Sequence, residues 1–182
     1  MISGRQETGN YEVYRGCLLQ ESRGNDGDSF MVRLPDGRKA IIRLYFVDAP
    51  ESAFRRYGNG ETNHRRIADQ ARQMGGITPE QAVKVGKIAK SFTLGMLGES
   101  SFVIHTRWDS PFQDDRYHAF VEVVQDGSTE WLHELLIRQG LARLKTKPAD
   151  LPDGTPVAQQ KEKLLGLQGE AKRSGLGAWG VE

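Results

Sequence analysis

The sequence predicts a single α+β domain in which a small β-barrel carries helices on its outside. The chain has 182 residues, a length that one hydrophobic core can serve. Segments rich in β-branched and aromatic residues, and segments with helical apolar spacing, follow in the order three strands, one helix, two strands and two helices. The strand at 38–47 is apolar on both faces, which indicates that both faces are covered, as in a barrel with helices packed against it.

The first three strands are predicted at 11–20, 28–34 and 38–47. The second and third form a hairpin, because Pro35-Asp36-Gly37 between them suits a tight turn. Strict alternation along the third strand puts Arg43 and Asp48 on opposite faces, since they are five positions apart. A bulge would bring them together, and so would a strand that has already ended at Asp48. The proline that follows favours the ending.

All of the predicted helices lie in the rest of the chain. Residues 52–78 are the least regular stretch, although 63–74 are compatible with a short helix. Thr78-Pro79-Glu80-Gln81 is a typical helix start, with a capping box and proline at the first position, and the helical spacing continues to Leu97. The remaining expected elements are strands at 101–107 and 117–124, a helix capped by Ser128 or Thr129 that ends at Gly140, and a last helix from Thr155-Pro156 to Gly175.

Three acids are predicted to meet at one end of the hairpin. Asp28 begins its first strand, Asp48 ends its second, and Glu51 follows closely, with Arg43 inside the second strand. Two carboxylates and a backbone carbonyl are the hard oxygen ligands that suit a divalent cation such as Ca²⁺, and arginine forks suit the equatorial oxygens of a phosphate. Arg116 is a second candidate for the latter role. From spacing alone, an ordinary turn and strand end explain these residues better than a site for a metal and a phosphate.

Charge and composition narrow the class of protein without deciding it. The net charge of +1 gives no overall basic bias, yet residues 53–90 hold eight arginines and lysines against three acids. That stretch is either a solvated face or a surface for phosphate backbones. The single cysteine excludes an intrachain disulfide and a cysteine-rich zinc site. No apolar run reaches the roughly 18 residues of a transmembrane helix, so no membrane contact is expected.

Five motifs occur along the chain in the order NDGDSF, IIRLYFVDAPES, DDRYHAF, WLHELLIRQGLARL and GEAKRSGLGAW. In this order they resemble the staphylococcal nuclease (thermonuclease) family, from Tyr11 to Trp179. The resemblance implies a five-stranded OB-fold barrel with three α-helices, the last two strands lying between the first and second helices. It makes 1–182 a single domain, with a flexible stretch at 1–10 and an enlarged basic loop inserted at 52–78.

The resemblance also implies a role for each candidate residue. Asp28 and Asp48 would bind Ca²⁺ through their carboxylates, and Ala49 through its main-chain carbonyl. Glu51 matches the acid that positions or activates the attacking water. Arg43 and Arg116 match the two arginines that neutralise the pentacoordinate phosphate. Gln113-Asp114-Asp115 stands where the family has a Lys-Tyr pair that contacts a terminal phosphate, a departure that bears on substrate preference.

The function implied is calcium-dependent hydrolysis of DNA and RNA, with little sequence preference, to 3′-phosphate ends. We expect a monomer that prefers single strands. The resemblance implies a secreted or periplasmic protein, whereas the start MISGRQETGN lacks the apolar region of a signal peptide and suits a trimmed terminus or a cytoplasmic protein equally. Two alternatives stay open: a non-catalytic nucleic-acid-binding OB-fold module, and a protein-interaction domain whose acids are merely surface residues.

Overall fold

Five strands of the described residues close into a barrel, as predicted. The computed structural model describes residues 6–8 and 10–182. The barrel strands are β2 (Tyr11–Leu19), β3 (Ser29–Arg33), β4 (Lys39–Leu44), β7 (Arg116–Gln125) and β6 (Phe102–Thr106), in that order around the sheet. Pairing of β2 with β6 closes the ring, and β4 and β7 are parallel neighbours. This confirms the OB-type α+β fold.

Two short strands extend the barrel sheet. Strand β1 (Gln6–Thr8) pairs with β2, so part of the stretch expected to be flexible is a strand; residues 1–5 and 9 lie outside the described residues. Strand β8 (Ser128–Trp131) pairs with β7, which corrects the prediction that Ser128 or Thr129 caps a helix. Asp126 and Gly127 have φ of 50° and 78°, the left-handed pair that makes a two-residue hairpin turn, and this turn sends the chain back along β7.

Four α-helices occur in the part of the chain that the structure describes, one more than predicted. They are α1 (His64–Gln73), α2 (Pro79–Glu99), α3 (Leu132–Arg138) and α4 (Val157–Ser174), followed by the 3₁₀ turn η1 (Gly177–Trp179). The additional helix, α1, forms inside the expected loop because Ile67 and Ala71 bury against Ala82 and Val83 of α2. Thr78 begins α2 with the predicted capping box. None of the helices within the described ranges is long and apolar enough to cross a membrane.

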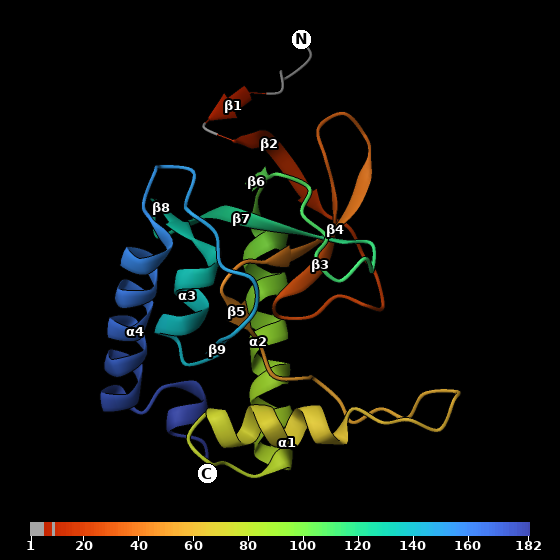
Figure 1. Ribbon diagram of the computed structural model, residues 1–182, viewed down its shortest axis with the longest axis vertical. Helices are drawn as coiled ribbons and strands as arrows, with labels where there is room; N and C mark the ends of the chain where they lie inside the picture. Colours follow the sequence, from red (N-terminus) through yellow and green to blue (C-terminus); the bar gives the residue numbers. More distant parts are fainter. Residues whose placement is uncertain (1–5, 9) are drawn as a thin grey trace.

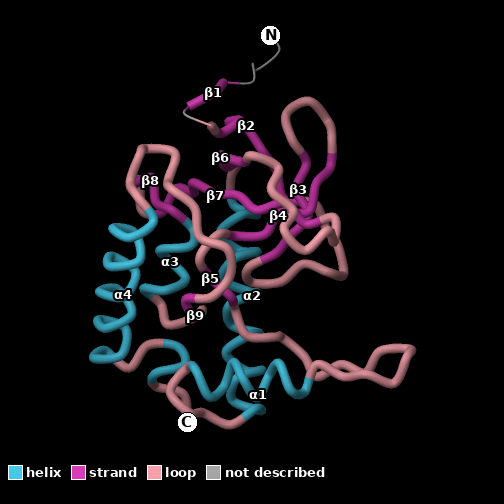
Figure 2. Tube along the Cα trace, viewed as in Figure 1, coloured by secondary structure: helices cyan, strands magenta, loops and turns pink. Residues whose placement is uncertain are grey.

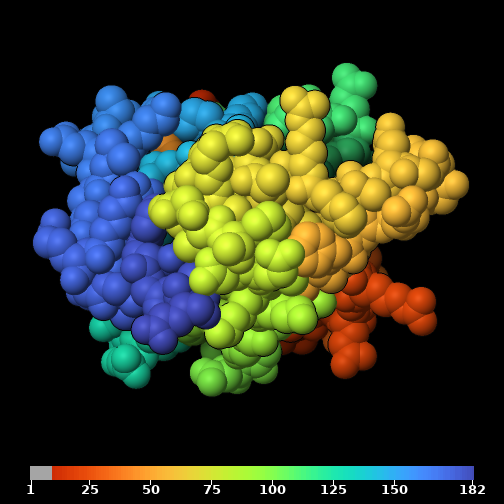
Figure 3. Space-filling view, turned by 90° about the horizontal axis from the view of Figure 1, so that it is seen from below, coloured from red at the N-terminus to blue at the C-terminus, as the bar shows by residue number. Residues whose placement is uncertain are grey.

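The helices lie on one side of the barrel (Figure 1, Figure 2). Helix α2 runs along the molecule behind the strands, α1 crosses its lower end, and α3 and α4 lie beside each other on the opposite side from the hairpin. Between Pro50 and α1 the chain makes a narrow arm, residues 53–62, which is closed by a bridge between Arg56 and Thr62. This arm projects from the body of the molecule (Figure 3).

The predicted conflict between Arg43 and Asp48 is resolved by an early strand end. Strand β4 stops at Leu44, and Phe46 then takes a left-handed φ of 69°, which turns the chain. Val47 and Asp48 form a separate two-residue strand, β5, paired with β9 (Arg143–Leu144). The break places Asp48 on the same side as Arg43. Tyr45, between the two strands, is fully buried.

A buried histidine in this core makes a prediction about acid stability. Burial, with a smaller contribution from nearby Lys163, lowers the pKa of His133 from 6.5 to about 3. The unfolded chain takes up that proton near its ordinary pKa, whereas the folded chain does not. This contribution to stability is therefore complete above the unfolded pKa and is lost as the pH falls towards the folded one, at up to ~1.4 kcal/mol per pH unit.

We expect His133→Gln to reduce the slope of unfolding free energy against pH below pH ~6.5 by about one proton, measured by urea denaturation. The exposed His64, replaced by glutamine, is the matched control and is expected to leave the slope unchanged. A wild-type slope retained in His133→Gln would assign the acid sensitivity to other groups. One of them is His118, whose pKa is lowered to about 4 by burial and then by the charge of Arg43.

Candidate functional site

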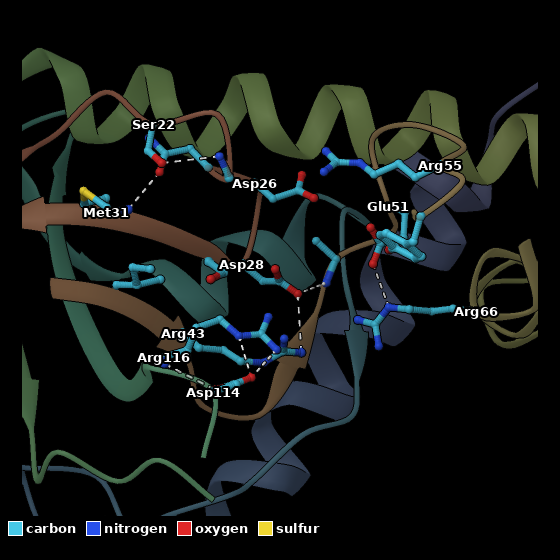
Figure 4. Close-up of a pocket in the computed structure, with 16 residues that line it drawn as sticks. Ser22, Asp26, Asp28, Met31, Arg43, Glu51, Arg55, Arg66, Asp114 and Arg116 are labelled. Carbon is cyan, nitrogen blue, oxygen red and sulfur yellow. Dashed lines mark hydrogen bonds and ion pairs between the residues drawn. The ribbon is translucent and has the colours of Figure 1, made fainter. Parts of the chain in front are cut away.

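A cavity of about 480 Å³ opens beside the β3–β4 hairpin, and all the predicted site residues except Asp48 line it (Figure 4). Its walls come from the loop before β3, from β4, from the segment after β5, from α1 and from the start of β7. The charged residues that line it are Asp26, Asp28, Arg43, Glu51, Arg55, Arg66, Asp114 and Arg116, and the backbone at Ala49 lines it too. Side chains far apart in the sequence therefore face one space.

The two aspartates meet as the hairpin predicts. Asp28 and Asp48 are both buried, and one terminal nitrogen of Arg43 lies 3.1 Å from Asp48 Oδ1 and 3.8 Å from Asp28 Oδ2. The backbone N–H of Ala49 donates to Asp28 Oδ2 at 2.9 Å, which ties the segment after β5 to the loop before β3. Arg43 thus lies beside both carboxylates, of which Asp28 lines the cavity and Asp48 does not.

Asp48 is surrounded by donors from the described residues. Its Oδ1 accepts hydrogen bonds from Arg43 at 3.1 Å and from Arg66 at 2.6 Å. Its Oδ2 accepts from Arg143 at 2.7 Å and from Gln70 at 3.1 Å. Burial favours protonation, but the charges of Arg66 and Arg143 outweigh it and hold the pKa of Asp48 below its usual value. Asp48 is therefore a charged, fully bonded carboxylate.

Asp28 has the opposite electrostatic character. Burial, followed by repulsion from Asp48, raises the pKa of Asp28 to about 7, and the charge of Arg43 only partly opposes this. The two carboxylates share Arg43, yet Asp48 receives the additional guanidinium groups. Asp28 is consequently the carboxylate of the pair whose negative charge is less well compensated by nearby cations.

Glu51 lies at the rim and is held from two sides. Its Oε1 accepts a hydrogen bond from Arg66 Nε at 2.7 Å, and its backbone N–H donates to Gln70 Oε1 at 3.0 Å. Its side chain is 21% exposed, so solvent reaches it. On the other side Gly86 of α2 packs against the Glu51 backbone without room for a side chain. The helix therefore sets the position of this carboxylate.

Arg116 reaches the cavity through the parallel pairing of β4 with β7. Ile41 is the register partner of Arg116, and Arg43 lies two residues further along the same face of β4. This pairing explains how residues 73 positions apart line one cavity. The guanidinium of Arg116 donates to Asp114 Oδ2 from Nε at 2.8 Å and from a terminal nitrogen at 2.6 Å. A phosphate would have to replace Asp114 on this fork.

Comparison with known protein families shows to which family the chain belongs. A model of the family described as staphylococcal nuclease homologue matches residues 41–181. The chain belongs to this family. No curated protein matches it. The matched segment contains Arg43, Asp48, Glu51 and Arg116, whereas Asp28 lies before it.

Within this nuclease homologue, four side chains that the sequence did not single out complete the site. Arg66, Gln70 and Gln73 are spaced by four and three positions, which places them on one face of α1. The first two bond Asp48, and Gln73 Oε1 accepts from Arg143 at 2.8 Å. Arg143 itself lies opposite Asp48 in the β5–β9 pair. Helical spacing was the available signal for α1, but it does not say which group the face contacts.

The metal that the family implies requires donors, and the donor types are present. Asp28, Asp48 and the Ala49 carbonyl are hard oxygens of the kind that Ca²⁺ takes. These oxygens already accept hydrogen bonds that a metal ion would have to replace. Both carboxylate oxygens of Asp48 accept from arginines, and the Ala49 carbonyl accepts from Gln70 Nε2 at 3.2 Å. Over the described ranges, no three His, Cys, Asp or Glu side chains form a group that could hold a metal. The set fits Ca²⁺ in chemistry but not in its present bonding.

Proposed function

We propose that this nuclease homologue hydrolyses phosphodiester bonds of DNA and RNA with little sequence preference, leaving 3′-phosphate ends. The observation that supports this is that Arg43, Arg116 and Glu51 line one cavity. Two arginine forks offer paired donors to a phosphate, and the carboxylate offers a base beside it. Little covalent chemistry is asked of a protein in phosphoryl transfer, so positioning and charge neutralisation supply most of the catalysis.

The residues divide the reaction between them. Arg43 and Arg116 bind the equatorial oxygens of the phosphate, after Arg116 exchanges Asp114 for the substrate. Glu51 orients a water and takes its proton as the oxygen attacks phosphorus in line. The new P–O bond forms as the bond to the 5′ oxygen breaks, and the departing oxygen takes a proton from solvent. The partial exposure of Glu51 allows both water and substrate to reach it.

Calcium is the cofactor that we propose, held by the carboxylates of Asp28 and Asp48 and by the Ala49 carbonyl. When bound, Ca²⁺ would neutralise charge on the phosphate. The raised pKa of Asp28 supports this placement, because a buried carboxylate next to a second one gains most from a nearby cation. The other side chains of the mechanism keep the roles given above.

The decisive experiment measures hydrolysis of a labelled single-stranded DNA by the wild type and by Glu51→Gln, each with Ca²⁺ and with EDTA. We expect cleavage only in Ca²⁺, and a loss of roughly 10²–10⁴-fold in the variant, because glutamine keeps the shape but cannot accept the proton. Undiminished cleavage in EDTA would remove the calcium assignment. Salt-sensitive binding without cleavage under any divalent ion would support the non-catalytic binding module instead.

A residue of the projecting arm is the reason that we propose single-stranded nucleic acid as the preferred substrate. Tyr57 lines the cavity, and the residue is 48% exposed. Bases of a single strand are open to stacking on such a ring, whereas bases in a duplex are not, and stacking contributes about 1–3 kcal/mol per base.

We therefore expect Tyr57→Ala to raise KM for single-stranded DNA by about tenfold while kcat changes little, because a stacking contact binds ground state and transition state alike. Steady-state kinetics on single-stranded and duplex substrates measures this. Phe54, which is exposed at 43% on the same arm but is absent from the cavity wall, is the control when replaced by alanine. Equal effects of Tyr57→Ala on both substrates would argue against stacking.

A further inference from the structure

Arg66 bridges two of the proposed active-site acids. Its Nε donates to Glu51 Oε1 at 2.7 Å, and its terminal nitrogen donates to Asp48 Oδ1 at 2.6 Å. Figure 4 shows the side chain reaching from α1 toward Glu51 on the side of the cavity away from Arg116. A single positive group thus connects Glu51, the proposed base, with Asp48, a proposed ligand of the cation.

Helix α1 positions this bridge. Ile67 and Ala71 anchor the helix on α2, and Gln70, one turn after Arg66, bonds Asp48, the Ala49 carbonyl and the Glu51 amide. The backbone of α1 is therefore fixed against the segment after β5. Arg66 lies on this face of the fixed helix. Its short hydrogen bonds to Asp48 and Glu51 have the lengths of charge-assisted pairs.

The guanidinium groups on Asp48 differ in their freedom to move. The side chain of Arg66 is 44% exposed, whereas that of Arg143 is 6% exposed and that of Arg43 is 7% exposed. Arg66 can turn outward into solvent by side-chain rotation. Asp48 would still be compensated by the two buried arginines, so the departure of Arg66 leaves no uncompensated buried charge.

We propose that Arg66 is an internal cation that competes with the divalent ion for Asp48 while it also holds Glu51, so that the ion binds only when Arg66 turns outward. The inference rests on the proposed function, because it concerns the same acids. Oδ1 of Asp48 already accepts from both Arg43 and Arg66, so a divalent ion would be a third positive group at this oxygen, and the departure of Arg66 removes part of the repulsion. The inserted helix therefore sets the concentration of divalent ion at which the site assembles.

The test measures Ca²⁺ binding directly, by isothermal titration calorimetry of the whole chain in the absence of substrate. Arg66→Gln is expected to bind Ca²⁺ at least about tenfold more tightly than wild type, since a charge-assisted bond no longer has to be broken first. Arg55→Gln is the matched control, because Arg55 lines the same cavity but makes no side-chain hydrogen bond or ion pair with any described residue. Its Ca²⁺ affinity is expected to stay within about twofold of wild type.

A second variant guards against a general effect of charge or folding. Arg66→Lys keeps the charge but lacks the fork that spans two carboxylates, so its affinity is expected between those of wild type and Arg66→Gln. Thermal unfolding without metal checks that both variants are folded. Equal Ca²⁺ affinity in wild type and Arg66→Gln overturns the proposal, as does tightening of Arg55→Gln to the same degree.

Absence of Ca²⁺ binding by every folded variant also overturns it, since removal of Arg66 should open the site. That result is distinguishable from failure of the proposed function, which is read from cleavage of single-stranded DNA. Cleavage that persists in EDTA would leave the phosphodiesterase standing without its cation. A folded chain that neither cleaves nor binds Ca²⁺ would remove both.

Discussion

Arg43→Ala is expected to lower the rate of single-stranded DNA hydrolysis by about 10³-fold or more, the range seen when an arginine that stabilises a phosphoryl-transfer transition state is removed. Arg43 is buried at the cavity floor, and Asp48 and Asp28 fix its guanidinium from one side. Its Nε is buried without a hydrogen-bond partner among the described residues, so the side chain retains donor capacity. Single-turnover cleavage at saturating enzyme measures the chemical step separately from binding.

Two further variants separate chemistry from folding. Arg43→Lys keeps a positive charge beside Asp48, so the fold is expected to survive, but a point charge cannot reproduce the planar fork on a phosphate. Its cleavage rate should therefore stay close to that of the alanine variant. Arg33, which is exposed in the adjacent strand β3, gives the control when replaced by alanine. Cleavage by folded Arg43→Ala within tenfold of wild type would assign phosphate stabilisation elsewhere.

The barrel was predictable because its signals are local. Alternation in β3, the Pro35-Asp36-Gly37 turn and the capping box at Thr78 each act over a few residues, and the structure has all three. The start of α3 was mispredicted because hydroxyl residues after a turn suit a helix cap and a strand equally. In the structure, Asp126 and Gly127 both have positive φ and form a hairpin turn. That conformation depends on the pairing of β7 with β8.

The candidate site divides in the same way. Asp28 directly precedes β3 and Arg43 lies in β4, while Asp48 follows this hairpin closely in β5, so their convergence could be predicted from a short stretch of sequence. Arg116 joins them through a parallel pairing that no local pattern predicts; the sequence offered it as a second candidate for the phosphate, and the resemblance to a known family then matched it to the second arginine of the site. The partners of Asp48 on α1 and β9 were missed for the same reason. Their contacts depend on how helix α1 packs on α2 and on a two-residue strand pair.

The position of Glu51 depends on a glycine, and Gly86→Ala is expected to disturb it. A Cβ built at Gly86 would lie 2.2 Å from the Glu51 carbonyl oxygen and 2.6 Å from that of Pro50. Helix α2 cannot easily withdraw, because Thr93 Oγ1 on the same helix donates to the Gly27 carbonyl at 2.7 Å. We expect a loss of roughly 1–3 kcal/mol in unfolding free energy from overpacking. A shift of Glu51 by ~1 Å would also cost about 10²-fold in cleavage rate.

Gly95→Ala, on the same helix, is the matched control for this prediction. A Cβ at Gly95 would meet no heavy atom of the described residues within 4 Å. Alanine there should raise stability by up to about 1 kcal/mol through its better helix propensity, with no change in cleavage. Urea denaturation and single-turnover cleavage of both variants test the contrast. If Gly86→Ala were as stable and as active as Gly95→Ala, α2 would not be what holds Glu51 beside the arginines, and the arm and α1 alone would have to position it.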